Sequence, residues 1–372
     1  MKKVLFIDHE PFCKRRDQLF HISHLMNDGF SVEVWDLSSF YNSGRNLPEK
    51  IEADYVKIFY SQEEVRKAIS TIDAPNTFVL IELHICDSNF WLFQELHRHH
   101  CYTARFDFYS NILPTYHIDL ESVPLFSKEY FLKVKKKIEN YIKWRLFQFK
   151  WRHIKYDCHL SPCSGNTITG RINHPDYNDY RFHLGDPLFS HPYYVFCDVF
   201  FPLHPDAIET TKHLDPQKYY AIMRRYFDYL EAKTSIPVVI AAHPKAQYIG
   251  NEFGNRPIIK YQTNNLVIHS EGVITHQSNS VAYAILADRK IVCVTTNDYD
   301  SIEGLRSYLR VIGTYFQIPV YNIEEENLDH VKFRNIDHTI RENYIYSFLT
   351  SKESENTENY EIIKKAILNA KK

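Results

Sequence analysis

The sequence alternates short apolar segments with amphipathic ones, and it does so in two separate series. Such alternation is typical of parallel β-strands joined by helices that cover the sheet. In the first series we expect strands at residues 2–8, 31–37, 54–60, 77–83 and 101–108. Helices are expected between them at 16–28, 62–71 and 88–99. The first 110 residues therefore predict an α/β domain.

The second series begins near residue 193 and has the same character. Strands are expected at 193–201, 236–242, 266–269, 272–275 and 290–296, with helices at 215–233, 279–288 and 301–316. A chain of 372 residues favours two domains over one. We therefore predict an α/β fold with two Rossmann-like domains facing a cleft and with C-terminal helices. The expected parts are an N-terminal domain (1–160), a linker (161–185), a C-terminal domain (186–338) and C-terminal helices around a charged break (339–372).

The composition indicates a compartment and argues against one class of partner. The formal net charge is -2, which does not point to nucleic acid. The seven cysteines show no paired spacing, so we expect free thiols in a reducing compartment. Asp8 interrupts the N-terminal apolar run, and no run approaches the ~20 apolar residues that a membrane span needs. We expect a cytoplasmic protein.

Polar residues follow two apolar strands of the second series. The segment IPVVIAAHP (236–244) ends in His243 and Pro244. The strand expected at 272–275 runs into five polar residues at a helix start, namely His276, Gln277, Ser278, Asn279 and Ser280. Ligands collect at the carboxyl ends of parallel strands, and a helix start with hydroxyl groups suits an anion. The pattern predicts a phosphate site. The structural alternatives are that His243 and Pro244 only end the strand and that the serine turn only caps the following helix.

A rigid polar turn follows the first strand of the second series. The segment VFCDVFFPLHPD (195–206) supplies Pro202, His204, Pro205 and Asp206. Because this cleft loop ends a strand that belongs to the same sheet as the phosphate motifs, we expect it to face the ligand. The alternative is a structural turn that leads into the next helix.

Together the two strand-end motifs resemble the nucleotide-binding half of GT-B glycosyltransferases. They are most similar to bacterial sialyltransferases and capsule-polysaccharide transferases, which use CMP-activated ulosonic acids and hold CMP with a His-Pro motif and a serine motif. The resemblance carries over to His243, Pro244, Ser278 and Ser280. Asn279 here separates two serines that are adjacent in the sialyltransferases. The resemblance implies a GT-B-like fold and a nucleotide-sugar donor bound by the C-terminal domain.

Inverting transfer needs a general base, which the resemblance assigns to the first domain. Side chains at the expected strand ends are the candidates: Asp8, Glu10, Glu82, His84 and Asp107. We rank Asp8 and Glu10 first because a short polar loop after the first strand usually faces the cleft. Each candidate also has a structural interpretation. His243 is expected to stabilise the departing nucleotide as well as to bind it.

We expect neither a metal nor a cofactor other than the nucleotide-sugar substrate. Asp298-Tyr299-Asp300 matches the Asp-x-Asp pattern that holds a divalent cation in GT-A transferases, but we expect a solvated loop there. A CMP donor has a single phosphate in its leaving group and needs no bridging metal.

The segment 128–155 is predicted to form one long helix. It contains ten Lys and Arg residues against two Glu residues, a net charge of +8. Apolar residues recur at close to helical spacing, at Phe131, Val134, Ile138, Tyr141, Ile142 and Phe149. Three interpretations are open, namely a solvated helix packed on the first domain, peripheral contact with an anionic inner membrane, and contact with nucleic acid. The last is disfavoured, and no nucleic-acid partner is expected.

We interpret the chain as a metal-independent GT-B glycosyltransferase of surface-polysaccharide biosynthesis, such as capsule assembly. The expected donor is a CMP-linked sialic-acid-like ulosonic acid, and the acceptor is a glycan, free, lipid-linked or protein-linked. One alternative is a transferase or epimerase that uses a UDP-sugar on the same fold. Another is a non-catalytic nucleotide-sugar-binding subunit of a capsule assembly complex.

Overall fold

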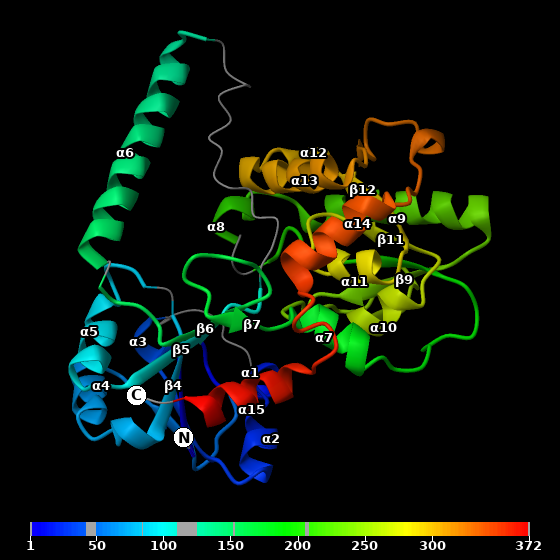
Figure 1. Ribbon diagram of the computed structural model, residues 1–372. Coiled ribbons are helices and arrows are strands. Elements are labelled where there is room, and N and C mark those ends of the chain that lie inside the picture. The colour runs from blue at the N-terminus through cyan, green and yellow to red at the C-terminus, as the bar shows by residue number, and fades with distance from the viewer. Residues whose placement is uncertain are drawn as a thin grey trace.

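The computed structural model describes residues 2–41, 50–83, 85–109, 125–151, 153–204 and 208–370. Three of the predicted site residues, His84, Pro205 and Asp206, lie outside these ranges. The described chain forms two parallel sheets with helices on their faces, one sheet in each half (Figure 1). The predicted α/β class, with two Rossmann-like units and C-terminal helices, is confirmed.

The first sheet has seven strands in the order β3-β2-β1-β4-β5-β6-β7, all paired in parallel. Its strands are β1 (Lys3–Asp8), β2 (Ser31–Asp36), β3 (Val56–Ile58), β4 (Thr77–Glu82), β5 (Tyr102–Phe106), β6 (Cys158–Ser161) and β7 (Gly170–Arg171). The helices of this half are α1 (Lys14–Phe20), α2 (Ile22–Asn27), α3 (Ser38–Tyr41), α4 (Gln62–Ile69), α5 (Phe90–Arg98) and α6 (Lys128–Trp151). Strands β1 and β4 are almost fully buried, as expected for parallel strands covered on both faces.

The second sheet has six strands in the order β10-β9-β8-β11-β12-β13, again all parallel. Its strands are β8 (Tyr194–Cys197), β9 (Val238–Ala242), β10 (Ile258–Lys260), β11 (Gly272–Thr275), β12 (Lys290–Thr295) and β13 (Val320–Asn322). The helices of this half are α7 (Pro175–Phe182), α8 (Ile208–Thr211), α9 (Pro216–Thr234), α10 (Thr263–Ile268), α11 (Val281–Leu286), α12 (Asn297–Asp300), α13 (Glu303–Phe316) and α14 (His338–Tyr344), and α15 (Asn359–Asn369) follows them in the chain. The longest of them, α9, begins with Pro216 in its first turn and an Asp215 side chain that accepts from the backbone N–H of Gln217.

Some expected elements differ in the structure. The segment 266–269, expected as a strand, falls largely in α10, because a short buried apolar run has the same composition in a helix and in a strand. The helix expected at 16–28 is two helices, separated at His21, whose φ of 52° is left-handed. The expected linker 161–185 contains β7, which extends the first sheet, and α7.

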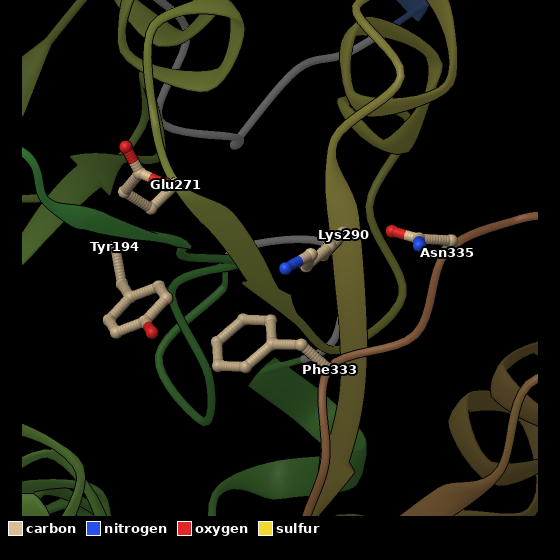
Figure 2. Close-up of a pocket in the computed structure, with 5 residues that line it drawn as sticks. All are labelled: Tyr194, Glu271, Lys290, Phe333 and Asn335. Atoms are coloured by element: carbon tan, nitrogen blue, oxygen red, sulfur yellow. The ribbon is translucent and has the colours of Figure 1, made fainter. Parts of the chain in front are cut away.

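A pocket of about 350 Å³ opens at the amino ends of the strands of the second sheet (Figure 2). Tyr194 and Lys290 are the first residues of β8 and β12, and Glu271 directly precedes β11. The ring of Phe333 stacks on Tyr194 with 4.6 Å between the centroids. A Cβ on Gly272 would come within 2.8 Å of the Phe333 ring, so this close packing requires glycine there.

The chain crosses between the two halves twice. It leaves the first sheet after β7 and enters the second half through α7. It returns after α14, and α15 packs Ile363 and Ile367 into the core of the first half beside Phe6 of β1. The C-terminal helix therefore belongs structurally to the N-terminal half, which no periodicity in the sequence indicated.

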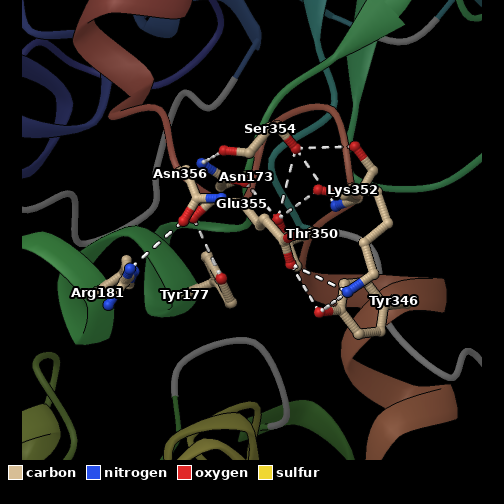
Figure 3. A network of polar contacts seen from close by, with 10 residues as sticks. Asn173, Tyr177, Arg181, Tyr346, Thr350, Lys352, Ser354, Glu355 and Asn356 are labelled. Carbon is tan, nitrogen blue, oxygen red and sulfur yellow. Dashed lines mark hydrogen bonds and ion pairs between the residues drawn. The ribbon is translucent and has the colours of Figure 1, made fainter.

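Buried side-chain amides join the two crossing segments (Figure 3). The Asn173 amide donates to the carbonyl oxygens of Ser354 and Thr357 at 3.1 and 2.8 Å. Its oxygen accepts from the Thr350 hydroxyl at 2.6 Å. Its backbone N–H donates to Asn359 Oδ1 at 2.9 Å, and the Asn359 amide donates back to the Asn173 carbonyl at 2.9 Å. Asn173 is fully buried, and its side-chain amide makes three of these hydrogen bonds.

The substitution Asn173→Ala should lower the free energy of unfolding by about 2–4 kcal/mol, because it removes the three buried hydrogen bonds of the side-chain amide. Urea denaturation followed by circular dichroism measures this. Asn356→Ala is the control, because Asn356 only accepts a hydrogen bond from Arg181 at an exposed site and its loss should change the value by less than about 0.5 kcal/mol. Equal effects of the two substitutions would contradict the assignment.

Candidate functional site

The second sheet has a topological switch point beside β8. The chain moves from β8 to β9 on one side, and β11 pairs with β8 on the other side. Loops that follow neighbouring strands leave in opposite directions at such a point and open a crevice at the carboxyl ends. The loops after β8, β9 and β11 contain the predicted cleft loop, the His-Pro motif and the serine turn, so the topology brings all three to one edge.

The motifs after β8 and β9 lie against each other. The rings of His204 and His243 are 4.7 Å apart and nearly perpendicular. The backbone N–H of Lys245 donates to His243 Nδ1 at 3.2 Å, which places the proton of a neutral His243 on Nε2. The Thr211 hydroxyl donates to the Pro202 carbonyl at 2.6 Å and ties the loop to α8. Neutral His243 therefore carries its N–H on Nε2, and an N–H is the kind of group that a phosphate oxygen requires.

Asp198, directly after β8, is a further candidate at this edge that was not among the predicted site residues. Its carboxylate accepts hydrogen bonds from the Phe200 backbone N–H at 3.0 Å and from the Tyr248 hydroxyl. Burial raises the pKa of Asp198 to about 6, although these hydrogen bonds act in the opposite direction. The signal in the sequence was an aspartate directly after the apolar run YVFC, the position at which polar groups enter a strand-end site.

His276 does not face the crevice. It is fully buried, and its Nδ1–H donates to the Val294 carbonyl at 2.6 Å while Nε2 accepts from the Tyr219 hydroxyl at 2.8 Å. Its ring stacks on Tyr299 at 4.7 Å. Burial lowers the pKa of His276 to about 4, so the ring is neutral at pH 7. With both nitrogens used inside the domain, His276 supports the turn and does not reach a ligand.

The remaining residues of the turn stay near the surface. Ser278 Oγ accepts from the Ser280 N–H at 3.2 Å, and the Gln277 N–H donates to the Tyr299 hydroxyl at 3.3 Å. Ser278 and Ser280 are half-buried and Asn279 is exposed. Ser278 therefore both organises the turn and keeps a hydroxyl at the edge of the sheet.

In the first half, a single arginine engages the two carboxylates that we ranked highest as the base. Arg16 Nε lies 3.0 Å from Asp8 Oδ2, and Arg16 Nη2 lies 2.9 Å from Glu10 Oε2. Asp8 is buried. The guanidinium thus holds both carboxylates in place. These contacts favour a positioning role for Asp8 and Glu10.

The sequence analysis passed over His9, which lies between these two carboxylates. Its Nδ1 is 2.8 Å from the Glu82 carbonyl oxygen and 3.4 Å from Asp8 Oδ1. The Asp8 hydrogen bond, opposed by burial, raises the pKa of His9 above its usual value. Since β1 and β4 are the strands at which the order of the first sheet reverses, the bond from His9 to Glu82 spans the switch point of that sheet. Its side chain is 41% exposed.

Glu82 and Asp107 have opposite environments. Burial raises the pKa of Glu82 to about 8, and one of its oxygens is buried without a hydrogen-bond partner. Asp107 pairs with Arg105 at 2.6 Å and with His159 Nε2 at 2.7 Å, and these contacts outweigh burial and lower its pKa to about 2. At neutral pH Glu82 is thus largely protonated and Asp107 is ionised, so neither suits the role of general base.

The carboxyl-end edges of both sheets converge on α7. On the first-half side, the guanidinium of Arg15 donates to the Tyr109 hydroxyl at 3.3 Å, and the Tyr109 ring meets His174 at 5.5 Å. On the second-half side, the Tyr283 hydroxyl on α11 donates to Asp179 at 3.4 Å. Burial raises the pKa of Asp176, between these contacts, to about 7. The two edges that carry the candidate residues therefore lie on either side of one short helix.

The Asp-x-Asp pair has structural partners. Asp298 forms an ion pair with Lys218 at 3.0 Å, and Asp300 accepts from the Thr295 hydroxyl at 2.9 Å. Both lie in α12, in place of the expected solvated loop. Among the residues that the structure describes, no group of three or more His, Cys, Asp or Glu side chains is placed to hold a metal ion.

No protein-family model and no curated protein matches the chain. Solved structures match it over most of its length at low identity. They include Arabidopsis thaliana UGT89C1 complexed with UDP-L-rhamnose (TM-score 0.44, 11% identity, 98% of each chain). Others are the glycotransferase of kitacinnamycin (0.42, 8%, 88% of each chain) and Methanocaldococcus jannaschii UDP-GlcNAc 2-epimerase in complex with UDP-GlcNAc and UDP (0.42, 11%, 93% of this chain and 98% of that chain). Similarity at this level leaves the function to be argued from the chain's own residues.

The burial of His276 predicts a pH-dependent stability. Between pH 6.5 and about 4 the unfolded chain binds a proton that the folded chain excludes, so this site destabilises the fold as the pH falls through that range. His276→Gln removes the effect. The stability advantage of the wild type over the variant should therefore shrink by up to about 3 kcal/mol between pH 7 and pH 4. Urea denaturation at each pH measures it.

His338→Gln is the control for this prediction, because the His338 side chain is 75% exposed. The difference in the free energy of unfolding between His338→Gln and the wild type should stay nearly constant with pH. A constant difference for His276→Gln as well would show that the imidazole is not held neutral by burial.

Proposed function

We propose that the chain is a glycosyltransferase that moves a sugar from a nucleotide donor, bound by the second half, to a hydroxyl group presented by the first half. One observation carries the proposal. Each sheet has a histidine at its carboxyl edge near the switch point, His9 directly after β1 in the first sheet and His243 directly after β9, the neighbour of β8, in the second. The first is arranged as a base and the second as an N–H donor. Transfer of a sugar from a phosphate leaving group needs both.

The donor side is built for a phosphate. Nε2–H of His243 donates to a phosphate oxygen, and the hydroxyl groups of Ser278 and Ser280 add further donors beside it. As the glycosidic bond breaks, negative charge grows on that phosphate, and the same donors stabilise it more strongly than in the bound substrate. The ring of His204 packs against His243 and so fixes the orientation of the His243 imidazole.

The acceptor side supplies the base. Because His9 Nδ1–H donates to the Glu82 carbonyl, Nε2 is the basic nitrogen of the ring. As the acceptor oxygen bonds to the anomeric carbon, Nε2 takes the hydroxyl proton, and the bond from that carbon to the phosphate oxygen breaks. Asp8 then stabilises the imidazolium that has formed, as its effect on the pKa of His9 requires. In this proposal His9 replaces Asp8, Glu10 and Glu82 as the base.

For the donor we favour a CMP-linked ulosonic acid, on the strength of the His-Pro and serine motifs. A leaving group with one phosphate suits a site of histidine and serine donors. The acceptor would be a glycan or glycoconjugate of surface-polysaccharide assembly at the cytoplasmic face of the membrane. A UDP-sugar donor is the competing proposal, and binding of nucleotides distinguishes the two.

Isothermal titration with CMP, UDP and GDP tests the donor site. We expect CMP to bind tightest and His243→Ala to weaken its binding by about 10- to 100-fold, the effect of losing a hydrogen bond to a charged group. His330→Ala is the matched control, because His330 is exposed and follows Asp329, which pairs with Lys233 at the far end of α9. Preferential binding of UDP would assign the donor to the alternative class. Binding of no nucleotide, or unchanged binding by His243→Ala, would overturn the proposal.

Substitution of His9 tests the base. His9→Ala should lower kcat by about 10²- to 10⁴-fold, with nucleotide affinity unchanged. Because the Asp8 hydrogen bond raises the pKa of His9, Asp8→Asn should shift the acidic limb of the kcat/KM profile to lower pH. Glu10→Gln should retain most of the activity. If Glu10→Gln is as inactive as His9→Ala, the base is a carboxylate and this assignment is wrong.

A further inference from the structure

Helix α6 extends away from the rest of the molecule. Figure 1 shows it standing beside the first half, with its amino-terminal end far from both sheets. A helix of 24 residues is about 36 Å long. Near its carboxyl end, Lys150 lies 3.6 Å from Asp87, and Ile154 and Tyr156 pack on the core of the first half. The helix is therefore held at its base, and most of its length is presented to the surroundings.

One side of α6 is an exposed apolar stripe. Residues with spacings of three, four and seven share one face of a helix. The exposed fractions on this face are 57% for Phe131, 54% for Ile138, 60% for Tyr141 and 50% for Ile142. A shallow pocket of about 460 Å³ runs beside Tyr141, Ile142 and Phe149. Contiguous exposed apolar surface of this kind marks an interaction site in a protein that is otherwise well packed.

The positive charge of the segment distinguishes between the possible classes of partner. Residues 128–155 contain ten Lys and Arg and two Glu, a net charge of +8, in a chain whose formal net charge is -2. A second copy of α6 would bring the same positive charge against it. Nucleic acid would pair with the lysines and leave the apolar stripe in water. An anionic lipid surface satisfies both features, because its headgroups attract lysines and its acyl chains accept apolar side chains.

We propose that α6 lies on the surface of an anionic phospholipid bilayer, with Phe131, Ile138 and Ile142 inserted at the headgroup boundary and the lysines on the flanks. Lysine side chains reach the headgroups while their methylene stems cover the apolar stripe. None of the described helices is long and apolar enough to span a bilayer, so α6 binds along the surface. This proposal rests on α6 alone and does not require the proposed transferase activity.

Membrane docking through α6 orients the first half of the molecule. The helix is inserted between β5 and β6, and Asp107 and His159 at that end of the sheet belong to the acceptor side. A lipid surface held against α6 would therefore lie next to the half that contains His9. An acceptor carried on a lipid would reach such a protein by diffusion in the plane of the bilayer.

Co-sedimentation with vesicles tests the proposal. The full-length protein should bind vesicles of mixed phosphatidylcholine and phosphatidylglycerol, and should not bind phosphatidylcholine alone. Charge reversal at the exposed Lys136, Lys137 and Lys143, each to Glu, should weaken binding to the mixed vesicles by at least on the order of 100-fold, since each basic residue contributes about fivefold. Raising the salt concentration should release the wild type partly.

The matched control carries the same change in net charge elsewhere. Lys67, Lys332 and Lys365 are exposed and lie outside α6, and their reversal to Glu should leave binding nearly unchanged. A second variant, Phe131→Ser with Ile142→Ser, changes side chains that are at least half exposed and should remove the binding that persists at high salt. Circular dichroism and the thermal midpoint verify the fold of every variant.

The proposal is overturned if the wild type does not bind the mixed vesicles, or if the control reversal weakens binding as much as the reversal on α6. It is also overturned if sedimentation shows a dimer that Phe131→Ser with Ile142→Ser dissociates while vesicle binding is unchanged, since α6 would then pair two copies. Loss of nucleotide binding by the His243 variant leaves this result untouched, so the two proposals fail independently.

Discussion

The hydrogen bonds around Asn173 hold the arrangement of the two halves. This buried amide joins the first crossing of the chain, just before α7, to the second crossing between α14 and α15. A buried amide needs hydrogen-bond partners, and the surrounding carbonyl and hydroxyl groups supply three of them only in one relative placement of the segments. Because α15 then packs against β1, the placement of the second half is linked to the strand that ends at Asp8 and His9. The geometry of the candidate site thus depends on a residue that belongs to neither sheet.

The two switch points have different chemistry, and the contrast underlies the proposed division of labour. In the first sheet the hydrogen bond to Asp8 raises the pKa of His9 against the effect of burial, and the Glu82 carbonyl at Nδ1 holds its tautomer. In the second sheet His243 receives a hydrogen bond from the backbone of Lys245 and offers its other nitrogen as a donor. In the proposed function the same kind of side chain acts as a base in one half and as a phosphate ligand in the other. The two histidines differ in the partner of Nδ1, which is the Glu82 carbonyl for His9 and the Lys245 backbone N–H for His243.

Much of the architecture followed from local patterns. The buried strands β1, β4, β9 and β12 are near-continuous apolar runs, and the motifs at 243–244 and 276–280 were found because polar residues come directly after such runs. Errors arose where the local pattern is ambiguous. The run at 266–269 is buried in either secondary structure, and β7 is a two-residue strand with no periodicity of its own. His276 stands in a polar run, and only the packing of Tyr219 and Tyr299 around it shows that it is a core residue.

By itself the sequence determined that the chain forms two parallel α/β units, that its polar strand ends lie at their carboxyl edges, and that a basic helix interrupts the first unit. These features depend on period and composition, which are local. Tertiary structure decided which polar residues are available: it paired Asp8 and Glu10 with Arg16, buried His276, left His9 partly exposed, and returned the C-terminal helix to the first half. Availability depends on burial and on partners that are distant in the chain, such as Glu82 for His9, and no local pattern records them.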